Sequence, residues 1–170
     1  MKQLALINPE NVSEKEVKEY PVRESVRAIV VDEEGKIALL HVVKENYFKW
    51  PGGGIEGAED KMTALNRECD EEIACDIEVF GEIGSIVEYR TIFNLKQISY
   101  CYLAKVKKKK GVPTFTDFEK EKGFKNVWLN YEEAMNSLIN SQATSVEGRS
   151  YIVPRDTILL KEAKNYLAKL

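Results

Sequence analysis

The chain has 170 residues, of which 44% are hydrophobic and 31% charged, and its formal net charge is −3. This length supports one domain with a sizeable core, and this composition excludes a disordered chain. The weak negative charge gives no sign of a nucleic-acid partner, and no apolar run approaches the length of a membrane span, so we expect neither partner.

The N-terminal half predicts two strands followed by a helix. Residues 1–20 carry a short apolar patch and then acids, unlike a signal peptide, so we expect a cytoplasmic protein. The apolar, β-branched runs SVRAIVVD (25–32) and KIALLHVV (36–43) flank the acidic turn DEEGK, which predicts a hairpin of buried strands. A helix over about 60–73 follows three consecutive glycines.

The C-terminal half mixes strands and helices. We expect strands over 77–90, 96–106 and 124–129, a helix over NYEEAMNSLI with Asn130 as its N-cap, a loop over 140–150, and an amphipathic helix over about 155–170. This mixture predicts an α+β fold with a mixed sheet. No repeat or linker marks a second domain, so we expect a single domain over 1–170. The last helix either covers the sheet or pairs with a second copy in a homodimer, with the same apolar set buried either way: Leu159, Leu160, Ala163, Leu167 and Leu170.

The soft metal ligands are sparse. Cys69, Cys75 and Cys101 lack CxxC spacing, which argues against a disulfide framework and against a zinc site. The one histidine, His41, lies in a predicted strand and cannot build a metal cluster or a triad by itself.

The helix over 60–73 carries an unusual density of acids. Its core face is the stripe Met62, Leu65, Cys69 and Ile73. Glu68, Glu71 and Glu72 are spaced to share a neighbouring patch, where they repel one another and face the negative end of the helix dipole. A solvated acidic face is one explanation. The other is a hard divalent cation, Mg²⁺ or Mn²⁺, which prefers clustered oxygen ligands.

The loop before this helix favours the metal. Pro51 restricts the backbone once, and Gly52, Gly53 and Gly54 then leave it bare, so it can approach a phosphate or a metal ion closely. A loop suited to anions beside a cluster suited to a cation indicates a site for a phosphate–metal complex.

The spacing of these residues resembles the Nudix box, GX5EX7REUXEEXGU, where U is aliphatic. Its fixed positions are matched by Gly53, Glu59, Arg67, Glu68, Glu71 and Glu72. At roughly 7% usage of each residue type, six such matches coincide by chance about once in ten million windows. Cys69 and Cys75 replace aliphatic residues, and Ala74 replaces the late glycine, which is awkward if that position needs a positive φ. The resemblance covers about residues 22–138.

The resemblance implies a three-layer α/β/α sandwich around a mixed sheet, and hydrolysis of a nucleoside diphosphate linked to another group. Glu68, Glu71, Glu72 and the carbonyl of Gly52 would hold the metal. Arg67 would orient Glu68 through a charge-assisted hydrogen bond. Glu59 would fix the loop. The general base would be Glu68 or an acid before the last strand, Glu121 in preference to Glu119.

The substrate is chosen by exclusion. Markers resembling those of ADP-ribose, diadenosine-polyphosphate and NADH hydrolases are absent, which favours a nucleoside triphosphate and a house-cleaning pyrophosphatase; an ADP-ribose or other nucleotide-sugar pyrophosphatase is the alternative. Phe48, Trp50, Tyr89 or Phe93 would line a base pocket, and Arg90 would meet a phosphate, although each has a structural explanation too.

Two other classes stay open. A Nudix-like module that senses nucleotides without turnover usually loses box glutamates, and here all are present. An isoprenoid-diphosphate isomerase of the same fold needs further acids and cysteines that the sequence does not show. The basic run KVKKKK, ending at Lys110, is read as a solvated turn with a modest steering role toward anionic nucleotides.

Overall fold

A computed structural model describes residues 1–109 and 111–168 of the chain. The elements follow in the order β1 (Gln3–Ile7), β2 (Val22–Val31), β3 (Ile37–Val42), β4 (Tyr47–Lys49), α1 (Lys61–Ile73), β5 (Cys75–Arg90), β6 (Leu95–Lys109), α2 (Asp117–Lys122), β7 (Phe124–Leu129), α3 (Tyr131–Ile139) and α4 (Val153–Leu167). Within the described residues, one mixed sheet has the strand order β1-β5-β6-β2-β3-β4, and β7 pairs with β3.

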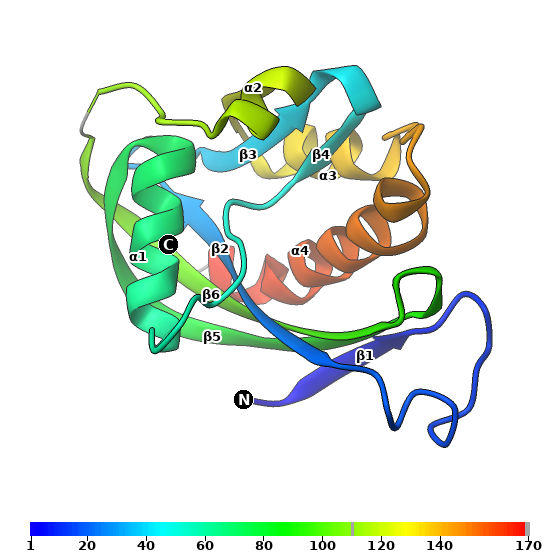
Figure 1. Cartoon of the computed structure of the whole chain (residues 1–170). Coiled ribbons are helices and arrows are strands. Elements are labelled where there is room, and N and C mark those ends of the chain that lie inside the picture. Colours follow the sequence, from blue (N-terminus) through cyan, green and yellow to red (C-terminus); the bar gives the residue numbers. More distant parts are fainter. Residues whose placement is uncertain (110, 169–170) are drawn as a thin grey trace.

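The sheet is covered by helices on both faces, with α1 and α4 on opposite sides of the strands (Figure 1). Alternate residues of β2 serve the two sides, because side chains in a strand point alternately to either face. Val30 packs in a cluster with Leu65 of α1, whereas Ile29 packs in a cluster with Leu160 of α4. The expected α+β fold and its three layers are confirmed.

The prediction that β2 and β3 form a hairpin is wrong, except for the turn that connects them. The two strands pair only at Val31 and Ile37, while β2 runs parallel to β6 along its whole length. Two segments take the place of a longer pairing: β4 pairs with the end of β3, and the glycine loop lies against β2. Val26 N–H donates to the carbonyl of Gly53 at 2.9 Å, and Ala28 N–H to that of Pro51 at 3.0 Å. The separation of β2 from β3 therefore makes room for the loop beside the sheet (Figure 1).

Several short elements differ from the sequence prediction. The apolar patch near the N-terminus forms β1, which pairs in parallel with β5, and β4 was also not expected. The acidic segment before β7 contains the helix α2 rather than only a loop, because Thr116 and Glu119 form a capping box. The predicted loop over 140–150 ends in a π-helical turn, Gly148–Ile152, that leads directly into α4.

The last helix covers the sheet. Leu159, Leu160 and Ala163 are fully buried in the cluster that contains the sheet residues facing α4. Asn130 caps α3 as predicted, its side chain accepting from the N–H of Glu133 at 2.9 Å. Leu170 and Lys110 lie outside the described residues, and the homodimer stays a prediction. Among the described residues, no helix combines the length and apolar character needed to cross a membrane.

Candidate active site

The acidic helix α1 begins and ends at well-defined caps. Asp60 accepts a hydrogen bond from the N–H of Thr63 at 2.7 Å, and Ala74 ends the helix with φ 52°, in the left-handed region. Leu65, Cys69 and Ile73 are buried as predicted. The positive φ at Ala74 is the strain anticipated where the late glycine of the box is replaced.

Close contacts explain two of the loop glycines. A Cβ on Gly52, whose φ is 130°, would lie 2.1 Å from the carbonyl oxygen of Val26. A Cβ on Gly53 would lie 2.2 Å from Oε1 of Glu68. The contact at Gly52 is with backbone, so only glycine lets the loop lie this close to β2, whereas a Cβ on Gly53 would displace the carboxylate of Glu68.

Arg67 ties the loop to the helix. Its guanidinium donates to both oxygens of Glu59, at 2.9 and 3.0 Å, and to the carbonyl of Gly54 at 3.1 Å. It also donates to Glu68 at 2.8 Å and, less closely, to Glu71 at 3.4 Å. The two hydrogen bonds from Arg67 to Glu59 lower the pKa of the Glu59 carboxyl group. Arg67 thus holds Glu68 in place, as the resemblance implied.

Glu72 is the most deeply placed carboxylate of the box. Its residue is only 1% exposed, and burial raises its pKa to about 7 against the opposing effect of Lys49. Lys49 of β4 donates to it at 3.0 Å, and the N–H of Gly52 at 2.6 Å. Burial also raises the pKa of Glu71. A pKa raised in this way indicates a carboxylate whose negative charge is not fully compensated by nearby cations.

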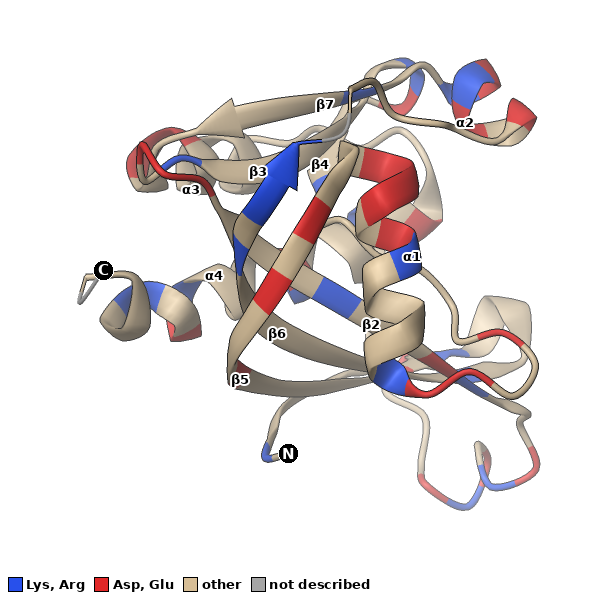
Figure 2. Cartoon of the chain, turned by 90° about the vertical axis from the view of Figure 1, so that its left-hand side faces the viewer, with Lys and Arg blue, Asp and Glu red and all other residues tan. Residues whose placement is uncertain are grey.

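The carboxylates of Glu68, Glu71 and Glu72 line one cavity of about 350 Å³, together with the glycine loop. Figure 2 shows acidic residues gathered at one end of α1. In the described part of the chain, no three acidic, histidine or cysteine side chains stand in a metal-binding arrangement. Lys49 and Arg67 instead serve as their counter-charges. All the donor atoms of these three side chains are oxygens, and the glycine loop borders them. This chemistry fits a hard divalent ion.

The same cavity also has a set of basic lining residues that the sequence prediction missed. Arg23 and Arg27 of β2, Arg90 at the end of β5 and Arg155 of α4 all line it. One signal was available, because an arginine inside a strand as apolar as SVRAIVVD is unusual. Nothing local connects it to Arg155, which the fold alone brings to the same cavity.

The predicted base-pocket residues Phe48 and Trp50 do not line this cavity. Trp50 is fully buried, and both its backbone and indole N–H groups donate to Asp156 at 3.0 Å. Phe48 stacks on His41 with ring centroids 4.3 Å apart. Both residues therefore have structural partners.

Some of the other predicted site residues line the cavity, and some do not. Of the two proposed bases in α2, Glu119 lines it, while Glu121 is exposed and does not. Arg90 lines it, whereas Tyr89 and Phe93 do not. The sequence could not show which of the two acids in α2 reaches the cavity, because the rotation of this helix depends on its packing against the rest of the fold.

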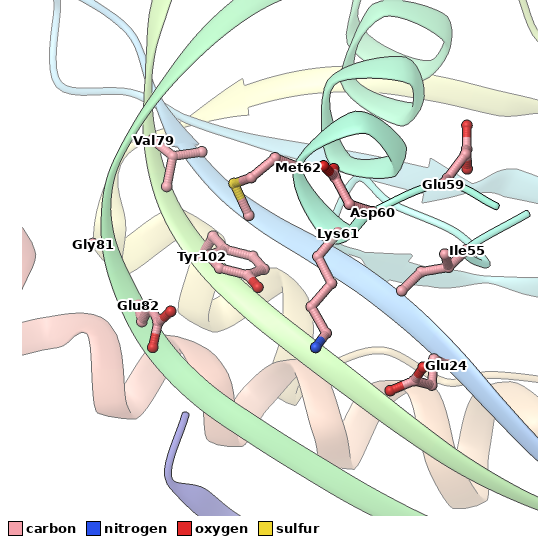
Figure 3. Close-up of a pocket in the computed structure, with 10 residues that line it drawn as sticks. All are labelled: Glu24, Ile55, Glu59, Asp60, Lys61, Met62, Val79, Gly81, Glu82 and Tyr102. Carbon is pink, nitrogen blue, oxygen red and sulfur yellow. The ribbon is translucent and has the colours of Figure 1, made fainter.

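A second, larger cavity of about 660 Å³ lies near the start of α1 (Figure 3). It offers four carboxylates, from Glu24, Glu59, Asp60 and Glu82, against a single cation, Lys61. Met62, Val79 and Tyr102 form an apolar group in its lining, and Ile55 lies apart from them, nearer to Glu59 and Glu24 (Figure 3). This balance of charge disfavours an anionic ligand there.

A comparison with models of known protein families shows the family to which this chain belongs. The family model described as NUDIX domain matches residues 21–151, which include the whole box and every residue that lines the cavity except Ile152 and Arg155. The chain belongs to the Nudix family. The resemblance carried by the box is thereby confirmed, and Nudix proteins generally use divalent metal ions.

Two curated relatives are similar to the chain over part of their length. The chain is 28% identical over 78 residues to an RNA pyrophosphohydrolase of Pelagibacter ubique (strain HTCC1062), covering 44% of this chain and 49% of that protein. It is 36% identical over 75 residues to an RNA pyrophosphohydrolase of Acidiphilium cryptum (strain JF-5), covering 41% and 46%. The matches span about half the length of these relatives.

Solved structures agree on the fold. A NUDIX hydrolase from Nitrosomonas europaea superimposes with a TM-score of 0.63, covering 88% of this chain and 90% of that chain at 13% identity. At this identity the likeness establishes the fold and leaves the substrate to other arguments.

Proposed function

We propose that this chain is a metal-dependent Nudix hydrolase that cleaves the pyrophosphate linkage of a nucleoside diphosphate derivative. The observation that carries the proposal is that one cavity is lined both by the box carboxylates and by four arginines from outside the box. A polyphosphate needs both, because its metal ion binds to carboxylates and its remaining charge to guanidiniums.

The proposed metal ligands are Glu68, Glu71, Glu72 and the carbonyl of Gly52, with Mg²⁺ or Mn²⁺ as the ion. When bound, the ion neutralises phosphate charge and makes a bound water more acidic. Arg67 keeps Glu68 oriented through the 2.8 Å hydrogen bond.

For the general base we favour Glu68 or Glu119. The side chain of Glu119 lines the cavity and accepts hydrogen bonds from Thr116 at 2.8 and 2.9 Å, which fix its position. Glu121, preferred on sequence alone, does not reach the cavity wall. A base must come within hydrogen-bond reach of the proton that it removes, and the position of Glu119 in the cavity lining supports it over Glu121.

The substrate that we propose is a 5′-triphosphate, with a free nucleoside triphosphate as the first candidate. A second candidate is the triphosphate end of an RNA, which the names of both curated relatives favour. The scissile chemistry is the same in both. An ADP-ribose or other nucleotide sugar, and a nucleotide-sensing module without turnover, are the outcomes against which the test is designed.

The test compares Glu71→Gln with Asp70→Asn. Both variants remove one negative charge from the same end of α1, but only Glu71 lines the cavity. Products are followed with nucleoside triphosphates, ADP-ribose and a short 5′-triphosphate RNA in Mg²⁺ and in Mn²⁺, and Mn²⁺ affinity is measured by electron paramagnetic resonance. We expect Glu71→Gln to lower kcat/KM and Mn²⁺ affinity about 100-fold, since even outer-sphere changes at metal sites cost 10- to 100-fold, and Asp70→Asn to change neither appreciably.

The panel also separates the candidates. Preference for the RNA over its free nucleotide would select the second candidate, and preference for ADP-ribose would reject a triphosphate. Nucleotide binding with no turnover of any substrate would leave the sensing module as the explanation.

A further inference from the structure

The larger cavity near the start of α1 contains a tyrosine hydroxyl group without a protein partner. Tyr102 of β6 is 4% exposed and belongs to the lining of this cavity. Within residues 1–109 and 111–168, its hydroxyl group forms no hydrogen bond. Figure 3 shows the hydroxyl group turned toward the space between Glu82 and Lys61. Because polar groups of buried side chains normally have a hydrogen-bond partner, this one indicates that its partner binds in the cavity.

Two carboxylates that line the same cavity lack an ion-pair partner. Glu82 lies directly opposite Tyr102 in the pairing of β5 with β6, so the two side chains share one face of the sheet. Glu24 of β2 accepts a hydrogen bond from the hydroxyl group of Tyr100, which carries no charge. Arg23, next to Glu24, lines the other cavity instead. In the part of the chain that the structure describes, neither carboxylate has a cation within ion-pair distance.

The other charged groups of the lining do not compensate these two carboxylates. Glu59 is held by Arg67, and Asp60 accepts a hydrogen bond from the first turn of α1. Lys61 supplies the one ammonium group of the lining, and this group lies over the ring of Tyr100, 3.9 Å from the ring centroid. An aromatic ring at the edge of the cavity therefore already attracts an ammonium group, while Glu24 and Glu82 stay without one.

The spread of these groups fits an organic cation better than a metal ion. Among the described residues, no three acidic, histidine or cysteine side chains converge closely enough to bind a metal ion. In Figure 3, Glu82 and Glu24 lie apart, and Tyr102 and Lys61 lie between them. The cavity has a volume of about 660 Å³, which is within the range of small-molecule sites. A ligand with positive charges at separate points and an apolar chain between them matches this lining.

We propose that this cavity binds an aliphatic polyamine. One ammonium group of the ligand contacts Glu82 and donates to the hydroxyl oxygen of Tyr102, and a second contacts Glu24. The methylene chain between them packs against Met62 and Val79, which are half-buried in the same lining. The ligand thereby supplies both the missing hydrogen-bond partner and the missing positive charge. The proposal does not depend on the proposed function, because this cavity is separate from the one lined by the box carboxylates.

The experiment adds spermidine, an aliphatic triamine, to the wild-type protein with isotope-labelled methionine methyl groups, and follows their nuclear magnetic resonance signals. Of the three methionines in the chain, only Met62 lines the cavity. Met135 packs against the cluster on the α4 side of the sheet and serves as an internal reference. We expect the Met62 signal to shift to a saturating value while the Met135 signal stays in place. Absence of spermidine binding, or binding that leaves the Met62 signal unmoved, would overturn the proposal.

Two variants of β5 test the contact with Glu82 by calorimetry. Glu82→Gln removes one negative charge from the cavity, and Glu78→Gln removes one from an exposed position of the same strand outside it. We expect Glu82→Gln to bind spermidine about 5-fold more weakly, which corresponds to one exposed ion pair, and Glu78→Gln to bind it like the wild type. Equal weakening in both variants would reduce the binding to the general negative charge of the protein.

Tyr102→Phe removes only the hydroxyl group that lacks a partner. We expect this variant to bind spermidine about 10-fold more weakly, which corresponds to one hydrogen bond to a charged group. Without ligand, its Tm should not fall, because the hydroxyl group has no hydrogen bond to the described part of the chain that could be lost. Tyr166→Phe, at a 48% exposed position of α4, is the control and should change neither quantity. A lower Tm of Tyr102→Phe with unchanged spermidine affinity would assign the hydroxyl group a structural role and overturn the site.

Two further comparisons identify the class of ligand and the place of binding. Putrescine and butylamine have the same carbon chain and differ by one ammonium group, so putrescine should bind about 5-fold more tightly; equal affinities would reject the contact with Glu24. Glu71→Gln should bind spermidine like the wild type, because Glu71 lines the other cavity. Loss of binding in this variant would place the amine at the box carboxylates and overturn the proposal. Spermidine binding without hydrolysis of any nucleotide would reject the hydrolase and leave the polyamine site standing.

Discussion

Arg67 joins three parts of the box through one planar side chain. Its hydrogen bonds reach Glu59 before the helix, Glu68 beside it on the helix, and the carbonyl of Gly54 in the loop. Lysine could not make these contacts together, because its ammonium lacks the planar fork of donors. Since all the partners lie within a short stretch of chain, the box spacing was enough to predict the arrangement of Arg67 and Glu68.

Ala74 is the residue at which the chain departs from the box with a physical cost. Its φ of 52° is unfavourable for any residue with a Cβ, by about 1–2 kcal/mol. We expect Ala74→Gly to raise the free energy of unfolding by about 1 kcal/mol in urea titrations, part of the strain relief being offset by the greater entropy of glycine in the unfolded chain.

The matched control for this change is Ala64→Gly near the start of α1, where the N–H of Ala64 donates to the carbonyl of Asp60. Ala64 is fully buried in a helical conformation, so the same substitution should lower stability by about 1 kcal/mol. If both variants lost stability alike, strain at Ala74 would not be the property measured.

Among the elements, the segment from β4 through the glycine loop has the largest influence on the site. It pairs with β3 at one end and lies against β2 at the other, so it bridges the opening between two strands that follow each other in the chain. The hairpin prediction failed because apolar, β-branched runs specify strands and not the strands with which they pair. Pairing partners are decided by which edges the rest of the sheet leaves free.

The start of α4 holds this segment from the other side. Asp156 accepts from the backbone N–H of Trp50 and pairs with Arg155, all three groups being fully buried. We expect Asp156→Ala to lower the free energy of unfolding by about 3–5 kcal/mol, because it leaves Arg155 without its closest counter-charge. Intrinsic fluorescence during denaturant unfolding reports the loss, since Trp50 lies at the contact.

Asp156→Asn serves as the comparison, because it keeps an acceptor for Trp50 and removes only the charge. It should lie between the wild type and Asp156→Ala in stability. Equal stability of all three proteins would mean that the contact between α4 and the loop is energetically minor.

The whole molecule has a core on each face of its sheet. Leu65 of α1 belongs to one and Leu160 of α4 to the other, and both are fully buried. We expect Leu65→Ala and Leu160→Ala each to lower the free energy of unfolding by about 2–5 kcal/mol, as cavities in packed cores do. Lys161→Ala, at the exposed position next to Leu160, should change it by less than about 0.5 kcal/mol.

The same variants test whether α4 has a second role in assembly. Because Leu160 is already buried within the chain, Leu160→Ala should not change the molar mass measured by light scattering at a given protein concentration. A fall in mass with little loss of stability would indicate instead that the predicted homodimer depends on this helix.

The sequence by itself determined the features that depend on short-range spacing. The acidic face of α1, its buried stripe, the Arg67 contact with Glu68 and the cap at Asn130 are all confirmed, because each involves residues within a turn or two of one another. The glycine loop was predicted for the same reason, since it directly precedes the helix. The metal role of the box carboxylates stays a prediction.

Only the tertiary structure decided what faces those carboxylates. Arg27, Arg90 and Arg155 come from three separate elements, and no local pattern connects them. The choice of Glu119 over Glu121, and the burial of Trp50 against Asp156, also depend on how distant elements pack. Residue spacing determines the acidic part of the cavity lining, whereas its basic part is assembled only when β2, β5 and α4 pack together in the fold.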